Sequence, residues 1–283
     1  MITATSNHSF LTNMIVSEIG DSGSPPSCSI PVADRAIAAS IETGLPTIKQ
    51  SVDGEADAVA MCVPIYRSEE IASVIVWVGN AHDDTVGAME IWQPIGEFDD
   101  LNLTQGYYGP LDRFQNVSSF VRFEKGMGLP GQVWRNLSFV IHDNLPSHPG
   151  FLRAAGASAE SLQVAVGIPV CGEDFLAAAV LISSDSAPIA RGYEVWRCVE
   201  DHLLLESRAY QRLEQSLMYE IDQTVPLEGS LPGLAYLSGV ATISEDPDIV
   251  YSGRPFRGGS PCKGVAIPFF EQDRMTNILT LLL

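Results

Sequence analysis

The feature that most constrains the fold is a pattern that recurs three times: a small residue, an apolar pair, a proline, and then a polar loop that leads into an apolar strand. A proline inside a strand is tolerated only at an edge or an irregularity, because it lacks a backbone amide. The polar stretches RSEE, CGED and EQD separate the two apolar runs, so each copy predicts a β-hairpin. The three hairpins span Ala60–Val78, Ala165–Ser183 and Gly264–Leu283.

The middle copy is accompanied by the other elements that a domain needs. An earlier strand is expected at Gly87–Trp92 (GAMEIW) and a helix at Pro149–Glu160 (PGFLRAAGASAE). From Gly87 to Ser184, the ordered segments GAMEIW, FVRFEKGMGLPGQVW, FVIHDN, FLRAAGASAESLQVAVGIPV and AAAVLISS resemble a GAF domain. The resemblance implies an α+β fold, in which an antiparallel sheet is flanked by helices.

Three glycines in this stretch have the G-x-G-x-x-G spacing of a dinucleotide-binding loop: Gly126, Gly128 and Gly131. That motif requires a buried parallel strand before it and a full crossover helix after it. The preceding residues SSFVRFEKG mix polar and apolar side chains, and QVWRNLS allows only about two helical turns. The glycines therefore predict a turn from a strand into a short helix, and no nucleotide site.

The expected organisation has two GAF-like units, one complete and one built from partial flanking segments. The complete unit covers residues 85–190, and the partial segments cover 31–80 and 230–283, after a flexible leader at 1–30. A first strand for the N-terminal segment is missing unless Asn13–Ile19 supplies one. Two alternatives stay open for the flanking segments: each is a degenerate unit of its own, or they complete one another.

A long connecting helix is expected at residues 191–222, which contain no glycine or proline after Gly192. Apolar residues recur there with a 4-3-4-3-4 spacing that is interrupted at Glu206, a pattern typical of an amphipathic helix. Such a helix either pairs with its copy in a homodimer or packs on its own sheet. The sequence leaves both alternatives open.

The charge of the chain excludes several classes of function. At pH 7 the net charge is −19 with 16 Lys and Arg residues, which repels nucleic-acid phosphates and anionic lipid. The longest apolar runs are eight residues long, too short to span a bilayer. Five widely spaced cysteines without a C-x-x-C pair fit free thiols in the cytoplasm. We therefore expect a cytoplasmic protein without nucleic-acid or membrane partners.

Catalytic and metal sites have little support in the sequence. His142 and His148 lie close in sequence but lack a third strong ligand, so no metal site is expected, and Asp143 is expected to bind amides of the following turn. No nucleophile elbow and no Cys-His pair is present. Free methionine sulfoxide reductases are similar in fold to GAF domains, but the cysteine cluster of that family does not surround Cys171.

The GAF resemblance implies a ligand cavity between the sheet and a lateral helix, lined by apolar groups with a few polar ones. The bilin and cyclic-nucleotide signatures are absent, and no cofactor is expected. An arginine on the lateral helix could anchor an anionic ligand, although a salt bridge at the rim explains it as well. The candidate wall residues are Phe123, Trp134, Phe151, Arg153 and Val166.

The sequence thus predicts a non-catalytic, GAF-like sensor or regulatory protein that binds an unidentified small molecule or a signalling protein partner. In this reading the ligand or partner biases the packing of the helix at residues 191–222. Two alternatives remain: a structural or interaction module whose cavity is filled, and a GAF-fold redox enzyme such as a methionine sulfoxide reductase.

Overall fold

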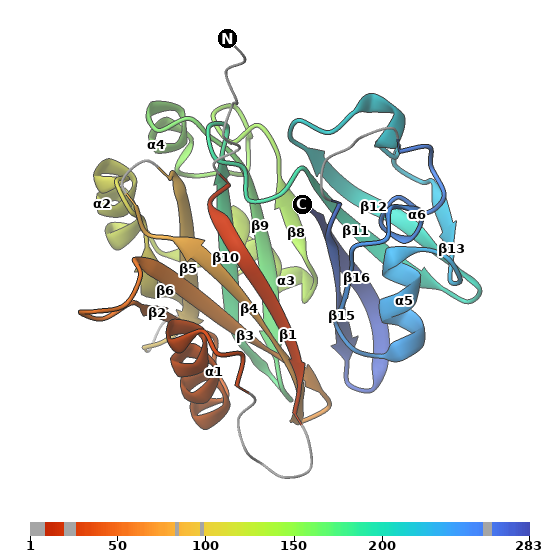
Figure 1. Ribbon diagram of the computed structural model, residues 1–283. Helices are drawn as coiled ribbons and strands as arrows, with labels where there is room; N and C mark the ends of the chain where they lie inside the picture. The colour runs from red at the N-terminus through yellow and green to blue at the C-terminus, as the bar shows by residue number, and fades with distance from the viewer. Residues whose placement is uncertain (1–8, 20–26, 83–84, 97–98, 257–261) are drawn as a thin grey trace.

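The computed structural model describes residues 9–19, 27–82, 85–96, 99–256 and 262–283, which form three antiparallel sheets with helices on their outer faces (Figure 1). The first sheet has the strand order β1-β4-β3-β2 and carries helix α1. Its elements are β1 (Leu11–Glu18), α1 (Pro31–Thr43), β2 (Thr47–Gln50), β3 (Ala58–Arg67) and β4 (Glu70–Asn80).

The second sheet has six strands in the order β7-β6-β5-β10-β9-β8. Its strands are β5 (Gly87–Pro94), β6 (Asp100–Tyr107), β7 (Phe123–Glu124), β8 (Val140–His142), β9 (Leu162–Cys171) and β10 (Phe175–Ser184). Its helices are α2 (Asp112–Phe120), α3 (Gly128–Asn136) and α4 (Ala154–Ala159). The expected glycine turn is confirmed, because Gly126 and Gly128 have φ values of 95° and 62° between β7 and α3.

The third sheet also has six strands, in the order β13-β12-β11-β16-β15-β14. Its strands are β11 (Gly192–Val199), β12 (His202–Tyr210), β13 (Thr224–Pro226), β14 (Thr242–Ser244), β15 (Gly264–Glu271) and β16 (Arg274–Leu282). Its helical elements are α5 (Leu231–Ser238), α6 (Pro247–Val250) and the 3₁₀ turn η1 (Gln215–Leu217).

All three sheets share one topology. In each sheet the first strand along the chain pairs with the last strand. The last strand also pairs with the strand before it, as a hairpin, and that strand pairs on its other side with a short edge strand. The two six-stranded sheets carry two further strands on the outer side of the first strand, and the first sheet has none there among its described residues. The first sheet is therefore the same unit without its second and third strands.

The recurring prolines are explained by this topology. Pro64, Pro169 and Pro268 each lie two residues past the last residue that pairs with the short edge strand. No neighbouring strand is paired on that side at the proline, so its missing amide costs no ladder hydrogen bond. The proline thus marks the point where the edge strand ends in every unit.

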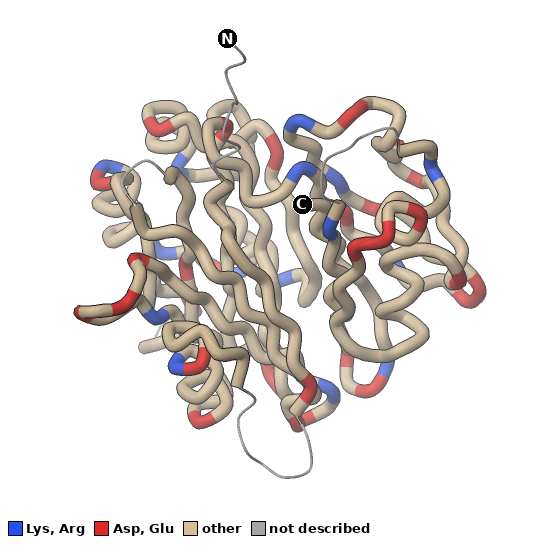
Figure 2. Tube along the Cα trace, in the orientation of Figure 1, with Lys and Arg blue, Asp and Glu red and all other residues tan. Residues whose placement is uncertain are grey.

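The three hairpins are buried on both faces, which explains their nearly continuous apolar runs. One face of each hairpin points into a core that all three sheets share, with Met61, Val166 and Val265 at equivalent positions. The opposite face packs against the helices of the same unit. Charged residues lie mostly at strand ends and in loops (Figure 2).

The α+β class and the antiparallel sheets flanked by helices are confirmed, and two complete units are present as the two six-stranded sheets. The open question about the flanking segments is resolved, because each segment belongs to a sheet of its own. The leader at 1–30 was expected to be flexible, with Asn13–Ile19 as the one candidate for a first strand. Leu11–Glu18 forms β1, paired along β4, so the first strand is present and this part of the leader is ordered. Residues 1–8 and 20–26 of the leader lie outside the described residues.

The connecting helix expected at residues 191–222 is wrong, because this segment forms the hairpin β11–β12 and the turn η1. Val199 pairs with His202, so Glu200 and Asp201 form the tight turn between the two strands. In the sequence these two acids look like part of the polar face of an amphipathic helix, and the turn went unrecognised. Tyr193 points into the shared core and Trp196 into the helical side, so burial on both faces hides the alternation of a strand. A dimer contact through residues 191–222 stays a prediction, and it loses the helix on which it was based.

Candidate functional site

A buried ion pair between β5 and the residue before α4 lies at the centre of the second unit. Arg153 Nη1 donates to Glu90 Oε1 and, at 2.6 Å, to Ser118 Oγ, and Arg153 Nη2 donates to Glu90 Oε2 at 2.9 Å. Trp92 Nε1 and the Tyr108 hydroxyl donate to the same carboxylate, each at 2.9 Å. The side chains of Glu90 and Arg153 are 0% and 1% exposed. A fully buried pair of this kind needs such additional hydrogen bonds to offset desolvation.

Four aromatic rings surround the guanidinium group. Arg153 Cζ lies 4.6 Å from the ring centre of Phe114, 5.3 Å from Phe151, 5.4 Å from Trp92 and 5.7 Å from Phe123. Ring faces attract a cation at these distances. Burial, followed by the negative charge of Glu90, raises the pKa of Tyr108, so its hydroxyl remains a donor to the carboxylate.

The structure brings together three of the five predicted pocket residues. Phe123, Phe151 and Arg153 lie in the cluster around Glu90. Trp134 packs at its margin, stacked on Phe175 at 5.7 Å. Val166 lies on the opposite face of the sheet, in the shared core. Successive residues of a strand point to opposite faces, and its neighbour Ala165 is the one that faces the Arg153 side. Binding of a ligand by these residues stays a prediction, and the place of an anion beside Arg153 is taken by Glu90.

Part of the same arrangement occurs in the third unit. Glu194 and Trp196 occupy the positions of Glu90 and Trp92. The register shows this, because β11 pairs with β16 in the same way as β5 pairs with β10. The Tyr210 hydroxyl donates to Glu194 Oε1 at 2.8 Å, as Tyr108 does to Glu90, and Thr280 Oγ1 donates to Glu194 Oε2 at 3.0 Å. The sequence carried this signal as the pair MEIW and YEVW, although GVATIS was matched to GAMEIW instead.

Arg254 approaches this second carboxylate differently. Its guanidinium stacks on Tyr219 at 3.4 Å and donates to the backbone oxygens of Leu217 and Tyr251. Burial raises the pKa of Glu194, while the positive charge of Arg254 acts in the opposite direction. The third unit thus holds a buried carboxylate that accepts hydrogen bonds from two hydroxyl groups.

An open pocket lies where the first and third units meet. Two other junctions are filled: β2 lies against β6, where Ile48 N donates to Gln105 Oε1 at 2.8 Å, and β8 lies against β12. At the third junction the first sheet has no counterpart of β6 or β12 among the described residues. The pocket beside β1 has a volume of about 420 Å³.

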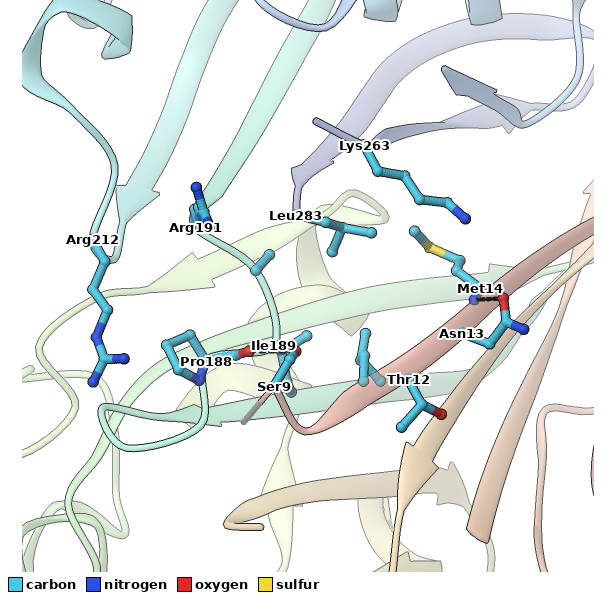
Figure 3. Close-up of a pocket in the computed structure, with 12 residues that line it drawn as sticks. Ser9, Thr12, Asn13, Met14, Pro188, Ile189, Arg191, Arg212, Lys263 and Leu283 are labelled. Carbon is cyan, nitrogen blue, oxygen red and sulfur yellow. Dashed lines mark hydrogen bonds between the residues drawn. The ribbon is translucent and has the colours of Figure 1, made fainter. Parts of the chain in front are cut away.

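Three positive side chains line this pocket: Arg191, Arg212 and Lys263 (Figure 3). None of the described lining residues is Asp or Glu, so the side chains of the lining carry a net positive charge. Lys263 Nζ also lies 3.7 Å from Glu245 Oε1, and Arg212 donates to the backbone oxygen of Asp185. An exposed pair such as Lys263–Glu245 contributes little free energy.

The rest of the pocket wall is apolar or weakly polar. It is formed by β1, by the link between β10 and β11, and by the end of the chain, with the residues Ser9, Leu11, Thr12, Asn13, Met14, Pro188, Ile189, Ala190 and Leu283. The sequence analysis missed this site, because its residues come from segments about 180 and 260 positions apart that only the packing of the units brings together. Arg191, Arg212 and Lys263 are far apart in the sequence, so no local signal marks them as a group.

Neither the histidines nor the cysteines form a reactive centre among the described residues. The rings of His142 and His148 stack at 3.9 Å, and burial lowers the pKa of His142 to about 3. Asp143 Oδ1 accepts from Asn144 N at 2.7 Å, which confirms its expected role in the turn. No group of three potential metal ligands occurs in the described parts of the chain. Burial raises the pKa of Cys171 to about 12.

Comparison with known proteins gives limited findings. No family model and no curated protein matches the chain. Among the described helices none is both long and apolar enough to cross a membrane.

Solved structures that resemble part of the chain include GAF domains. The GAF domain of A. aeolicus nlh2 is 17% identical with a TM-score of 0.28, covering 35% of this chain and 58% of that one. The free methionine-R-sulfoxide reductase of Neisseria meningitidis is also 17% identical with a TM-score of 0.28, covering 36% and 53%. A Staphylococcus aureus NreA protein, mutated in its nitrate binding site, is 14% identical with a TM-score of 0.30, covering 38% and 82%. This chain thus spans little more than half of the first two structures, and a likeness at this level does not extend to activity or ligand.

Proposed function

We propose that this chain is a non-catalytic sensory or regulatory protein that binds a negatively charged ligand in the pocket at the third junction. The observation that carries the proposal is the gathering of Arg191, Arg212 and Lys263 around one cavity of about 420 Å³ in a chain with a net charge of −19. A cavity of this size suits a small ligand or a short chain segment. Its apolar wall would bury the uncharged part of the ligand while the cations bind the anionic part.

Binding in this pocket would affect more than one unit of the molecule. Its lining comes from β1 of the first unit, from the link between the second and third units, and from residues next to β15 and β16. A ligand seated there would contact all of these segments at once. Binding would therefore stabilise one arrangement of the units relative to others, which is the basis of a regulatory response.

The alternatives receive less support from the geometry. The Glu90–Arg153 cluster fits the idea of a filled cavity within the second unit, but the open pocket at the junction does not. A redox enzyme requires a reactive thiolate, and a Cys171 pKa of about 12 leaves few thiolates at neutral pH. The five free cysteines agree with a reducing compartment, so we include a cytoplasmic location in the proposal.

The proposal is tested by thermal unfolding of the full chain with citrate, glycerol 3-phosphate and octanoate, supported by native mass spectrometry. We expect at least one anion to raise the midpoint with a saturating dose dependence. The double variant Arg212→Gln/Lys263→Gln should lose this shift. The control Arg113→Gln/Arg135→Gln removes the same charge from exposed positions of α2 and α3 and should keep it. An equal loss in both variants, or no shift with any anion, would refute the proposal.

A further inference from the structure

We propose that the occupant of this pocket is an extended segment of protein chain, acidic toward its C-terminal end, that pairs with the outer edge of β1. The inference rests on the proposed function, because it names the ligand of the same site. It starts from the repeated topology and not from the pocket alone. In the second and third sheets, the equivalent edge is covered by a strand of the chain itself.

The equivalence can be followed residue by residue across the sheets. Met14 pairs with Trp77 on β4, just as Met89 pairs with Leu181 and Tyr193 with Leu281. On the other side, Met89 pairs with Tyr107 of β6 and Tyr193 with Ala209 of β12. Tyr107 and Ala209 both point into the shared core. In the first sheet, the position equivalent to Tyr107 and Ala209 lies beside Met14, on the side away from β4. No strand of the described residues occupies that position.

The edge of β1 offers what such a segment needs. The Met14 amide donates to the side-chain oxygen of Asn13 at 2.9 Å, at the wall of the pocket (Figure 3). A side-chain oxygen is a weak substitute for a strand carbonyl and can rotate away. Edge strands that lack a neighbour are templates for pairing with an added strand. The apolar side chains of Leu11 and Met14 are buried toward the core, so an apolar residue of the partner can lie beside them.

Orientation and charge define the partner further. A strand antiparallel to β1, as β6 is to β5, would enter beside Glu18 and leave beside Leu11. Its C-terminal end would then lie in the pocket among Arg191, Arg212 and Lys263. Acidic side chains at that end would be complementary to the pocket. At its other end, Glu18 is an exposed acid and disfavours further acidic residues.

A single extended segment fits this place better than a second copy of the protein. The space beside β1 is bounded on its far side by the third unit, whose Lys263 and Leu283 line the same pocket. The β1 strand of another copy is already paired with its own β4 and would bring a whole sheet with it. Two copies with a net charge of −19 each also repel one another.

The test uses the full chain and a fluorescent peptide, acetyl-TVTVTVEE-amide, in an anisotropy titration. Two peptides and one small anion serve as controls: the same peptide with two alternate amides N-methylated, a TVTVTVKK version, and free citrate. We expect the EE peptide to bind, the N-methylated peptide to lose binding, and the KK version to bind about five- to tenfold more weakly. The variant Arg212→Gln/Lys263→Gln should weaken the EE peptide to the level of the KK version, and Arg113→Gln/Arg135→Gln should not.

Hydrogen exchange supplies a second readout. Binding of the EE peptide should protect amides within Leu11–Glu18, where a strand is added, more than those of α1. Equal binding of the EE and N-methylated peptides would overturn strand pairing. Binding of citrate without any binding of the EE peptide would overturn this inference while the proposed function stands. If neither binds, both proposals fall.

Discussion

Replacement of Arg153 by alanine tests whether the Glu90–Arg153 pair is a structural centre of the second unit. The variant leaves the Glu90 carboxylate buried with two of its donors, Trp92 and Tyr108. Removal of one partner of a buried ion pair typically costs about 3–5 kcal/mol, because the remaining charge stays desolvated. For a chain of this size, about 2–4 °C per kcal/mol converts this to a fall of roughly 6–20 °C in the unfolding midpoint.

The assay is urea unfolding of the wild type, of Arg153→Ala, and of Arg135→Ala as an exposed control. Arg135→Ala should stay within about 0.5 kcal/mol of the wild type. The double variant Glu90→Leu/Arg153→Leu removes both charges and should recover most of the loss, since apolar replacement of a buried pair is often neutral or stabilising.

Chemical rescue sharpens the same test. The four rings and Glu90 form a site shaped for a guanidinium group, so millimolar methylguanidinium should raise the midpoint of Arg153→Ala more than that of the wild type. A cost below about 1 kcal/mol for Arg153→Ala, or a double variant less stable than the single one, would contradict the reasoning.

Three further predictions concern the other buried groups. Burial raises the pKa of Glu194 above its unfolded value, so the stability that its protonated form contributes is complete below the unfolded pKa and is lost as pH rises through the folded pKa. Glu194→Gln should therefore make the thermal unfolding midpoint depend less on pH in the weakly acidic range. Gly167→Ala would place a Cβ 2.4 Å from Val133 and should cost about 1–3 kcal/mol in urea unfolding, whereas Cys62→Ala at the equivalent position should cost less; equal costs would refute the packing argument. Native Cys171 should react with iodoacetamide at pH 8 far more slowly than the same residue in urea, as followed by mass spectrometry.

Much of the fold followed from local chemistry. Prolines within apolar runs and polar turns predicted the three hairpins, and the glycines at 126 and 128 predicted the turn before α3. The helix expected at 191–222 failed for a physical reason. The first five residues of β11 are buried on both faces, so this strand shows no clean alternation of polar and apolar residues. In β12 the burial does alternate, but the run of three leucines at 203–205 hides it in the sequence, because the half-buried Leu204 is as apolar as its buried neighbours. A tight turn made of Glu200 and Asp201 gave no glycine or proline to mark it.

The candidate sites divide in the same way. Phe123, Phe151 and Arg153 were expected to lie together, and they do, because they come from one unit whose elements follow one another along the chain. Val166 was placed on the wrong face, since a shift of one residue along a strand exchanges the two faces of the sheet. The partner of Arg153 was missed because Glu90 lies 63 positions away in the sequence.

The sequence by itself determined the repeated hairpin with its internal proline and the acidic surface, since these depend on composition and on residues that are close along the chain. Only the tertiary structure decided that three sheets share one core and that two of their junctions are filled while the third is open. The pocket at that junction depends on this packing, because its cations at positions 191, 212 and 263 lie beside β1 only when the first and third units meet. Contacts between distant segments carry no local signal, and the proposed binding site lies among such contacts.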